Sequence, residues 1–268
     1  MKTSRLHSST LADVIQAWLR MARRWLDPLL RPVSSHAATG VMDPPLYGDP
    51  GQARDEFTRH AGLTFDAPEL DRRLLLLAGL AASGRAGGVH VVIDVGGSTG
   101  LHRGQIAAVL SPGVPLDWVV IETDAYCDAA ATLARPGIVY FNCMAQALGQ
   151  GIRPTCIYSN SALQYVDDPL AALSEFAASG ARAIVLERTP FLTGDTTTHA
   201  VQTLPRGNAD RRVAALTLVA SGRVAQCLQE HGFQVALYRT DRAAFRLGGE
   251  IIDLYSLLAV RSATGSTI

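Results

Sequence analysis

Hydrophobic residues recur along the chain with two periods, and these periods predict where helices and strands lie. From Leu11 to Leu30, apolar residues recur every three or four positions, which predicts an amphipathic helix with arginines over much of its other face. Residues 32 to 56 are rich in Pro, Gly and small polar residues, so we expect a linker or a surface loop there. A second helix is predicted from about Ala67 to Ser83.

Beyond residue 83, short apolar runs alternate with Ala- and Leu-rich stretches of helical length. The runs are Val89–Val95, Trp118–Glu122, Ile138–Phe141, Thr155–Ser159 and Ala183–Glu187. This alternation predicts a parallel sheet with helices on both faces. Two further runs, Phe233–Tyr238 and Leu254–Val260, have no helical period between them and predict a closing antiparallel hairpin. The sequence therefore predicts an α/β fold with a doubly wound, seven-stranded sheet and a ligand at the carboxyl ends of its strands.

Composition and charge narrow the class of protein. With 268 residues, 48% hydrophobic and 18% charged, the chain can bury one substantial core. We expect one domain over residues 55–268, preceded by a helical extension and linker over residues 1–54. Basic and acidic residues balance at 24 each, which disfavours nucleic acid as a partner. The four cysteines form no CxxC pair, so we expect reduced structural thiols and no metal site.

Charges interrupt every hydrophobic window of the first thirty residues. The interrupting residues are Asp13, Arg20, Arg23 and Arg24. This pattern leaves no apolar core for a signal peptide, and no stretch elsewhere is long enough to span a bilayer. We therefore expect a cytoplasmic protein without integral membrane association. A basic amphipathic helix can lie on a membrane or bind a partner, but we expect this one to dock on its own domain or to join two copies in a homodimer.

One segment combines a strand end, an acid and three glycines. Residues 94 to 100 read Asp-Val-Gly-Gly-Ser-Thr-Gly. Glycines let the chain turn tightly and let a ligand approach the backbone, although a simple turn is the plain structural alternative. The spacing is not the G-x-G-x-x-G of a dinucleotide fingerprint, and pyrophosphate would lie unfavourably against the acid. A phosphate loop would require a Lys that the segment does not have.

A ligand that carries positive charge fits the acid better. S-adenosylmethionine has an ammonium group and a sulfonium, and Asp94 to Gly100 resembles the first motif of class I methyltransferases, whose loop holds the methionine part of this cofactor. In that family the second strand ends in an acid that binds both ribose hydroxyls, which here corresponds to Glu122. The third strand often ends in a polar residue that reads the adenine edge, here Asn142. The ordinary alternative for both residues is an exposed position at a strand end.

The resemblance continues through CIYSNSALQYVDDPLAALSEFAASGARAIVLERTPF, which follows the family's fourth strand, helix and fifth strand. More narrowly, the chain is similar to an uncharacterised bacterial methyltransferase family with GGSxG, SSxLQY and (D/E)RTPF motifs. The likeness covers about residues 55 to 262 and departs from the pattern at Asn160, where Ser is more frequent. It implies a Rossmann-like methyltransferase sheet and S-adenosyl-L-methionine as cofactor, but no particular acceptor. The residues it implies for cofactor binding are Asp94, Gly96, Gly97, Ser98, Gly100, Glu122, Asn142, Ser159 and Asn160.

Four residues are candidates for the acceptor side, where the protein must align a nucleophile with the methyl group. Gln164 and Tyr165 follow the fourth strand, and Arg188 follows the fifth. His199 lies in a segment, Thr189 to Asp210, that we expect to be a long loop covering the acceptor, where an imidazole can take a proton near neutral pH. The structural alternatives are core packing for Tyr165, an ion pair for Arg188 and an exposed loop position for His199. His102 can contact either ligand, or cap or pack its own helix.

The sequence as a whole predicts a methyltransferase that acts on a small-molecule or glycan hydroxyl, or on an amine. A non-catalytic module that binds S-adenosylmethionine or S-adenosylhomocysteine is the alternative. A nicotinamide-dependent oxidoreductase is a third reading, which the glycine spacing disfavours.

Overall fold

The structure is a computed structural model that describes residues 29–32, 48–61, 63, 74–84, 86, 88–111, 113–133, 135–206, 210–247 and 250–262. Most of the helix predicted from Leu11 to Leu30, with its proposed homodimer contact, lies outside these residues. Its last two residues, Leu29 and Leu30, belong instead to strand β1 (Leu29–Pro32). No helix in the described part of the chain is long and apolar enough to cross a membrane.

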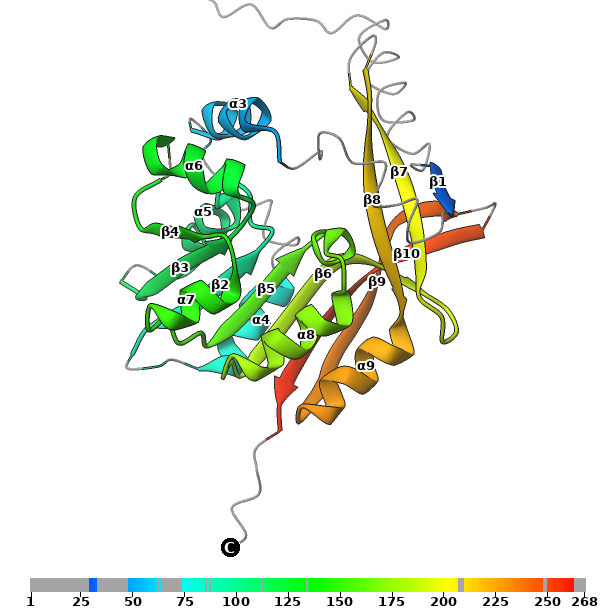
Figure 1. Ribbon diagram of the computed structural model, residues 1–268. Coiled ribbons are helices and arrows are strands. Elements are labelled where there is room, and N and C mark those ends of the chain that lie inside the picture. The colour runs from blue at the N-terminus through cyan, green and yellow to red at the C-terminus, as the bar shows by residue number, and fades with distance from the viewer. Residues whose placement is uncertain are drawn as a thin grey trace, which may run out of the picture.

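A parallel sheet forms the centre of the molecule (Figure 1). Its strands are β2 (His90–Val95), β3 (Leu116–Ile121), β4 (Ile138–Phe141), β5 (Cys156–Asn160) and β6 (Ala183–Leu192). They lie in the order β4-β3-β2-β5-β6, and all four neighbouring pairs are parallel. The first of these parallel strands, β2, lies in the middle; β3 and β4 follow on one side of it, and β5 and β6 on the other. The strand order therefore reverses between β2 and β5, which confirms the doubly wound sheet.

The closing hairpin is also confirmed, with longer strands than the apolar runs predict. Strand β9 (Phe233–Leu247) pairs antiparallel with β10 (Glu250–Arg261), and β10 pairs antiparallel with β6. These seven strands form the α/β fold expected from the sequence. Within the described residues the sheet has ten strands, because β1, β7 and β8 extend it.

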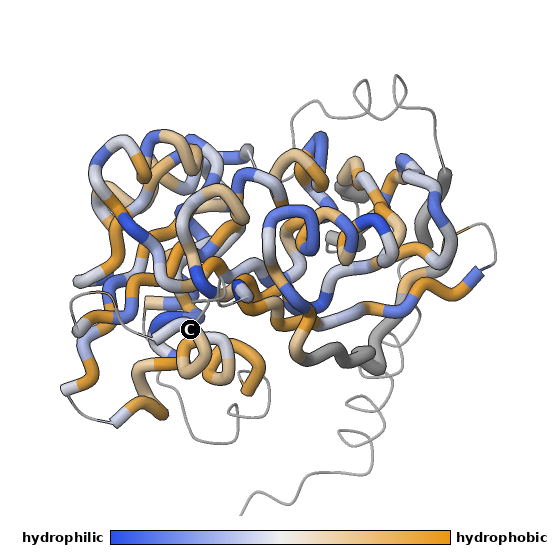
Figure 2. Tube along the Cα trace, turned by 90° about the horizontal axis from the view of Figure 1, so that it is seen from below, coloured by the Kyte–Doolittle hydropathy of each residue, from blue (hydrophilic) through white to orange (hydrophobic). Residues whose placement is uncertain are grey.

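Helices cover both faces of the sheet, as the alternation of strands and helices predicts. On one face lie α7 (Met144–Gly149), α8 (Pro169–Ala178) and α9 (Ser221–Glu230), and on the other α4 (Leu74–Ser83) and α5 (Leu101–Ala107). Successive strand residues point to opposite faces, so Ile93 joins the first core and Val92 the second. Apolar residues run along the central strands in Figure 2. Helix α4 begins at Leu74, within the predicted helix, while residues 64–73 lie outside the described part.

The linker prediction is wrong over its last residues, because a helix, α3 (Pro50–His60), begins there. Asp49 caps it, since its Oδ1 accepts hydrogen bonds from the backbone of Gly51 (2.8 Å) and Gln52 (3.2 Å). Pro50 fits the first turn, where no intrahelical donor is needed. Helix α3 packs on α6 (Asp124–Leu133) through an apolar cluster that includes Phe57. The boundary proposed between residues 54 and 55 therefore lies inside this helix.

The long loop predicted from Thr189 to Asp210 is also wrong. Strand β6 continues to Leu192, and residues 198 to 220 form a hairpin of β7 (Thr198–Arg206) and β8 (Asp210–Ala220). Apolar and β-branched residues in AVQT and VAALTLVA favour strands, and Thr198, the last of the three consecutive threonines, begins β7. Buried residues of the hairpin, among them Ala200 and Leu218, pack against β9 and β10. Strand β1 pairs antiparallel with β7 of this hairpin.

Candidate functional site

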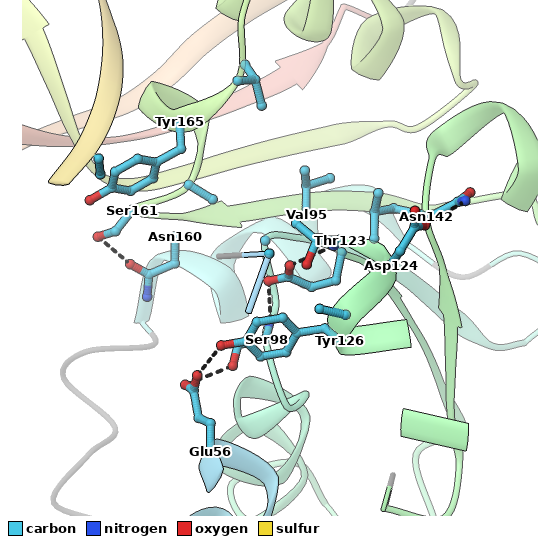
Figure 3. A pocket seen from close by; sticks show the side chains of 18 of the residues that line it. Glu56, Val95, Ser98, Thr123, Asp124, Tyr126, Asn142, Asn160, Ser161 and Tyr165 are labelled. Carbon is cyan, nitrogen blue, oxygen red and sulfur yellow. Dashed lines mark hydrogen bonds between the residues drawn. The ribbon is translucent and has the colours of Figure 1, made fainter. Parts of the chain in front are cut away.

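A cavity of about 730 Å³ opens at the carboxyl ends of the parallel strands (Figure 3). It lies where the strand order turns back, which is where open α/β sheets bind ligands. Its walls come from the loops after β2 to β5, from α3 and α6, and from β8. The lining residues are Gly48, Glu56, Val95, Gly96, Ser98, Ile121, Glu122, Thr123, Asp124, Ala125, Tyr126, Asn142, Asn160, Ser161, Ala162, Tyr165, Val166, Ala214 and Ala215.

The glycine loop forms one wall, and its geometry requires glycine. Gly96 has φ +70°, and a Cβ there would lie 2.2 Å from Cβ of Ala162. A Cβ on Gly97 would lie 2.6 Å from the carboxylate of Asp94. The loop after β2 therefore lies directly against the segment after β5 and over the strand-end acid. Ser98, also left-handed at φ +50°, presents its backbone N–H and its hydroxyl to two acids of the cavity.

Asp94 lies beneath this loop and does not line the cavity. It is fully buried, and its Oδ2 accepts hydrogen bonds from His102 Nδ1 (3.0 Å) and Trp118 Nε1 (3.1 Å). His102 Nε2 lies 3.4 Å from Nδ2 of Asn160, which does line the cavity. With Nδ1 protonated, His102 donates to Asp94 and accepts from Asn160. The strand-end acid thus supports the cavity wall through a chain of hydrogen bonds.

Glu122 follows β3 and lines the cavity as the resemblance implies. Its Oε1 accepts from the Ser98 backbone N–H at 3.0 Å and its Oε2 from that of Thr123 at 2.9 Å. Burial, with smaller contributions from Asp94 and Glu56, raises the pKa of Glu122 to about 7, although the two backbone donors oppose the shift. Near neutral pH the side chain is therefore divided between its acid and carboxylate forms.

Helix α3 contributes a second acid, Glu56, that the sequence analysis missed. Its carboxylate accepts hydrogen bonds from the Ser98 hydroxyl (2.9 Å) and from the phenol of Tyr126. Burial and Glu56 raise the pKa of Tyr126, which keeps that phenol protonated as a donor. One turn along, His60 Nδ1 lies 2.8 Å from Thr99 Oγ1. The Asp49–Pro50 cap and the apolar pair Ala53 and Phe57 were the signals that could have placed this helix.

Polar residues continue the wall on both sides of these acids. Asn142, after β4, donates from Nδ2 to Oδ1 of Asp124 at 3.1 Å, and both line the cavity. Across the cavity, Oδ1 of Asn160 accepts from the Ser161 hydroxyl at 3.2 Å. Ser159 is fully buried beneath them and does not line the cavity.

Of the four acceptor-side candidates, Tyr165 lines the cavity, and its hydroxyl donates to Oε1 of Gln202 on β7 at 2.8 Å. Gln164 is buried and donates to the Ser161 carbonyl oxygen at 2.8 Å. Arg188 has an exposed side chain and a left-handed φ of +52°, and its backbone N–H donates to Ser256. Neither Gln164 nor Arg188 is among the described residues that line the cavity.

His199 sits in the β7–β8 hairpin rather than in a covering loop. It lies opposite Thr217 in the strand register, and its Nδ1 is 3.2 Å from Thr217 Oγ1. It is absent from the described cavity wall. The part of the hairpin that does reach the cavity is β8, through Ala214 and Ala215.

No protein-family model matches the chain, and no curated protein matches it either. Among solved structures, the CcbJ methyltransferase from Streptomyces caelestis has a TM-score of 0.49 at 14% identity, covering 82% of this chain and 100% of that one. Magnesium protoporphyrin IX methyltransferase (ChlM) from Synechocystis PCC 6803, with bound SAH, has a TM-score of 0.46 at 15% identity, covering 81% and 96%. SAM-bound CalS10, an amino pentose methyltransferase from Micromonospora echinaspora, has a TM-score of 0.43 at 15% identity, covering 97% and 100%.

Proposed function

We propose that the chain is an S-adenosylmethionine-dependent methyltransferase that binds its cofactor in the half of the cavity between the glycine loop, β3 and β4. The observation that carries this proposal is the position of Glu122. This strand-end carboxylate is bound to the glycine loop through Ser98 and lies at the cavity wall. A carboxylate there can accept hydrogen bonds from both hydroxyls of a ribose.

The charges of the cavity fit a cofactor with a cationic end. Its wall holds three acids, Glu56, Glu122 and Asp124, and none of the described lining residues is Lys or Arg. Phosphate groups would find no cationic side chain among these described residues, which disfavours a nicotinamide dinucleotide. A volume of about 730 Å³ lies within the usual range of ligand pockets, about 300–1,000 Å³. We assign Glu122 to the ribose, Asn142 to the adenine edge, and the Gly96–Ser98 loop to the methionine part.

When bound, the cofactor supplies a methyl group already activated on a sulfonium. The protein then has to bind the acceptor and orient its oxygen or nitrogen toward that methyl group. Among the acceptor-side candidates we retain Tyr165, because it alone lines the cavity. A hydroxyl is the first choice of acceptor group and an amine the second.

The non-catalytic alternative is a module that binds the cofactor or its product without an acceptor. The cavity favours the enzyme, because it continues past the glycine loop to Tyr165, Val166 and β8. That end lies on the opposite side of β2 from Glu122 and Asn142 in the strand order. Room for a second molecule beside the cofactor is what a transferase requires and a simple binding module does not.

Isothermal titration of the full chain with S-adenosylmethionine, S-adenosylhomocysteine and NAD⁺ tests the proposal. We expect both adenosyl compounds to bind at one site per chain and NAD⁺ to bind at least about 100-fold more weakly, because pyrophosphate finds no cation on the described part of the cavity wall. Tighter binding of NAD⁺, or no binding of either adenosyl compound, would overturn it.

A further inference from the structure

The end of the cavity beyond the glycine loop differs in chemistry from the end that holds the acids. Its wall consists mainly of small apolar side chains and one aromatic ring, contributed by Ala162, Tyr165, Val166, Ala214 and Ala215, and the polar side chains of Asn160 and Ser161 line the cavity beside Ala162. The three acids of the cavity belong to α3 and to the segment after β3. In Figure 3, Tyr165 lies on one side of the glycine loop, and Asp124 and Asn142 lie on the other.

The hairpin and the segment after β5 fix this apolar end together. Gln202 pairs with Ala214 in the β7–β8 register. The amide oxygen that accepts the hydrogen bond from the Tyr165 hydroxyl therefore belongs to the residue directly opposite Ala214. Gln202 is buried, at 3% exposed. The phenol is therefore held against the hairpin. Ala214 and Ala215 of β8 both line this end of the cavity, and neither carries a side chain beyond Cβ.

We infer that this end binds a neutral, largely apolar acceptor with a hydroxyl group, rather than a glycan or an ion. This inference rests on the proposed methyltransferase function. A buried sugar would need a hydrogen-bond partner for each of its hydroxyls, and alanine and valine side chains offer none. An acceptor carboxylate or ammonium would lose its hydration without meeting an opposite charge among the described residues of this wall. Ser161 and the phenol oxygen of Tyr165 can serve a single hydroxyl.

Three small-molecule probes distinguish these acceptor classes. They are 1-naphthol, which is neutral and apolar with one hydroxyl, 1-naphthoate, which has the same ring with a negative charge, and methyl α-D-glucopyranoside. Each is titrated into the full chain with and without saturating S-adenosylhomocysteine. We expect 1-naphthol to bind at least about tenfold more tightly than either other probe, because burial leaves none of its polar groups without a hydrogen-bond partner. Equal or tighter binding of 1-naphthoate or the glucoside would overturn the inference.

A matched pair of variants locates the binding. Ala215→Leu fills the apolar end, whereas Ala178→Leu places the same side chain on the exposed side of α8. We expect Ala215→Leu to weaken 1-naphthol at least about tenfold while S-adenosylhomocysteine binds within about twofold of the parent. Ala178→Leu should change neither. An unchanged 1-naphthol affinity in Ala215→Leu would place the probe elsewhere and overturn the inference. If 1-naphthol binds the parent as expected but neither adenosyl compound binds, the proposed function fails and the apolar site stands.

Discussion

Ser98 donates its backbone N–H to Oε1 of Glu122 at 3.0 Å, so the glycine loop is bound directly to the end of β3. The Ser98 hydroxyl donates to Glu56 on α3 at 2.9 Å. One loop residue thus joins an acid of the sheet to an acid of the covering helix. These three side chains form the polar centre of the cavity.

Replacing Glu122 by Ala should weaken S-adenosylmethionine by about tenfold or more. A charge-assisted hydrogen bond is worth about 1.5–3 kcal/mol, and the ribose would lose at least one. Isothermal titration of Glu122→Ala measures the loss. Glu175→Ala, which removes an exposed acid on α8, is the matched control and should bind as the parent does. A folded Glu122→Ala variant with the parent's dissociation constant would remove Glu122 from the cofactor site.

The raised pKa of Glu122 predicts opposite effects of pH on stability and binding. The folded chain holds a proton on this side chain up to about pH 7, while the unfolded chain releases it near pH 4.5, the ordinary pKa of a glutamic acid. Between these values the folded state binds more protons, so Glu122 makes the free energy of unfolding fall as pH rises. Cofactor affinity should rise through about pH 7, because the carboxylate can accept from both ribose hydroxyls, whereas the protonated acid has lost part of its acceptor capacity.

Denaturant unfolding and titration at pH 5, 6, 7 and 8 measure both slopes, with Glu122→Gln as the reference variant. The parent should lose stability relative to Glu122→Gln between about pH 5 and pH 7, and the affinity of Glu122→Gln should not rise through pH 7. Parallel curves for the two proteins would mean that Glu122 titrates in its ordinary range.

The close approach of Gly96 to Ala162 predicts a rescue. Gly96→Ala should destabilise the fold by more than about 2 kcal/mol, because a left-handed φ alone costs about 1–2 kcal/mol and a collision adds to it. Gly151 has φ +85° with nothing within 4 Å, so Gly151→Ala reports the cost of the φ alone. Ala162→Gly leaves Cα at 3.6 Å as the nearest atom of residue 162, and should recover the collision part in the double variant. Strictly additive effects in denaturant unfolding would contradict the contact.

The sequence predicts the sheet well because each strand–helix unit carries its own apolar period. It places Glu122, Asn142 and Asn160 at the cavity for a related reason, since the carboxyl ends of parallel strands meet at one edge. Asp94 shows the limit of that rule. The residue is at the predicted strand end, but its side chain points under the loop to His102 and Trp118 rather than into the cavity.

Residues contributed by elements outside these units could not be found in this way. Glu56 meets Ser98 across 42 residues of sequence, from a helix whose start lies in a segment rich in Pro and Gly. Gln202 meets Tyr165 across 37 residues, from a strand in a segment that reads as a loop. Such contacts depend on how separate elements dock, which neither a strand pattern nor a loop motif specifies.

The hydrogen bond that Ser98 donates to Glu56 predicts that the Glu56 side chain holds α3 over the glycine loop. Glu56→Ala should speed hydrogen exchange of the α3 amides, because the helix loses both the Ser98 and the Tyr126 hydroxyl as partners. It should also weaken S-adenosylmethionine by about three- to tenfold, the worth of about one hydrogen bond. Asp55→Ala removes the adjacent, exposed acid of the same helix and should leave both measurements unchanged. Equal exchange rates in the two variants would show that α3 docks through its apolar face alone.

The hydrogen bond between Tyr165 and Gln202 predicts which acceptor-side residue matters for binding. Tyr165→Phe leaves the buried Gln202 oxygen without this donor, which should cost about 1–3 kcal/mol of stability. The double variant with Gln202→Leu should recover part of it, because both polar partners are then gone.

Tyr165→Phe should weaken 1-naphthol about two- to tenfold. His199→Ala should leave that affinity within about twofold, because His199 contacts Thr217 and does not reach the cavity. A loss in His199→Ala as large as that in Tyr165→Phe would require the hairpin to present its other strand, β7, to the acceptor.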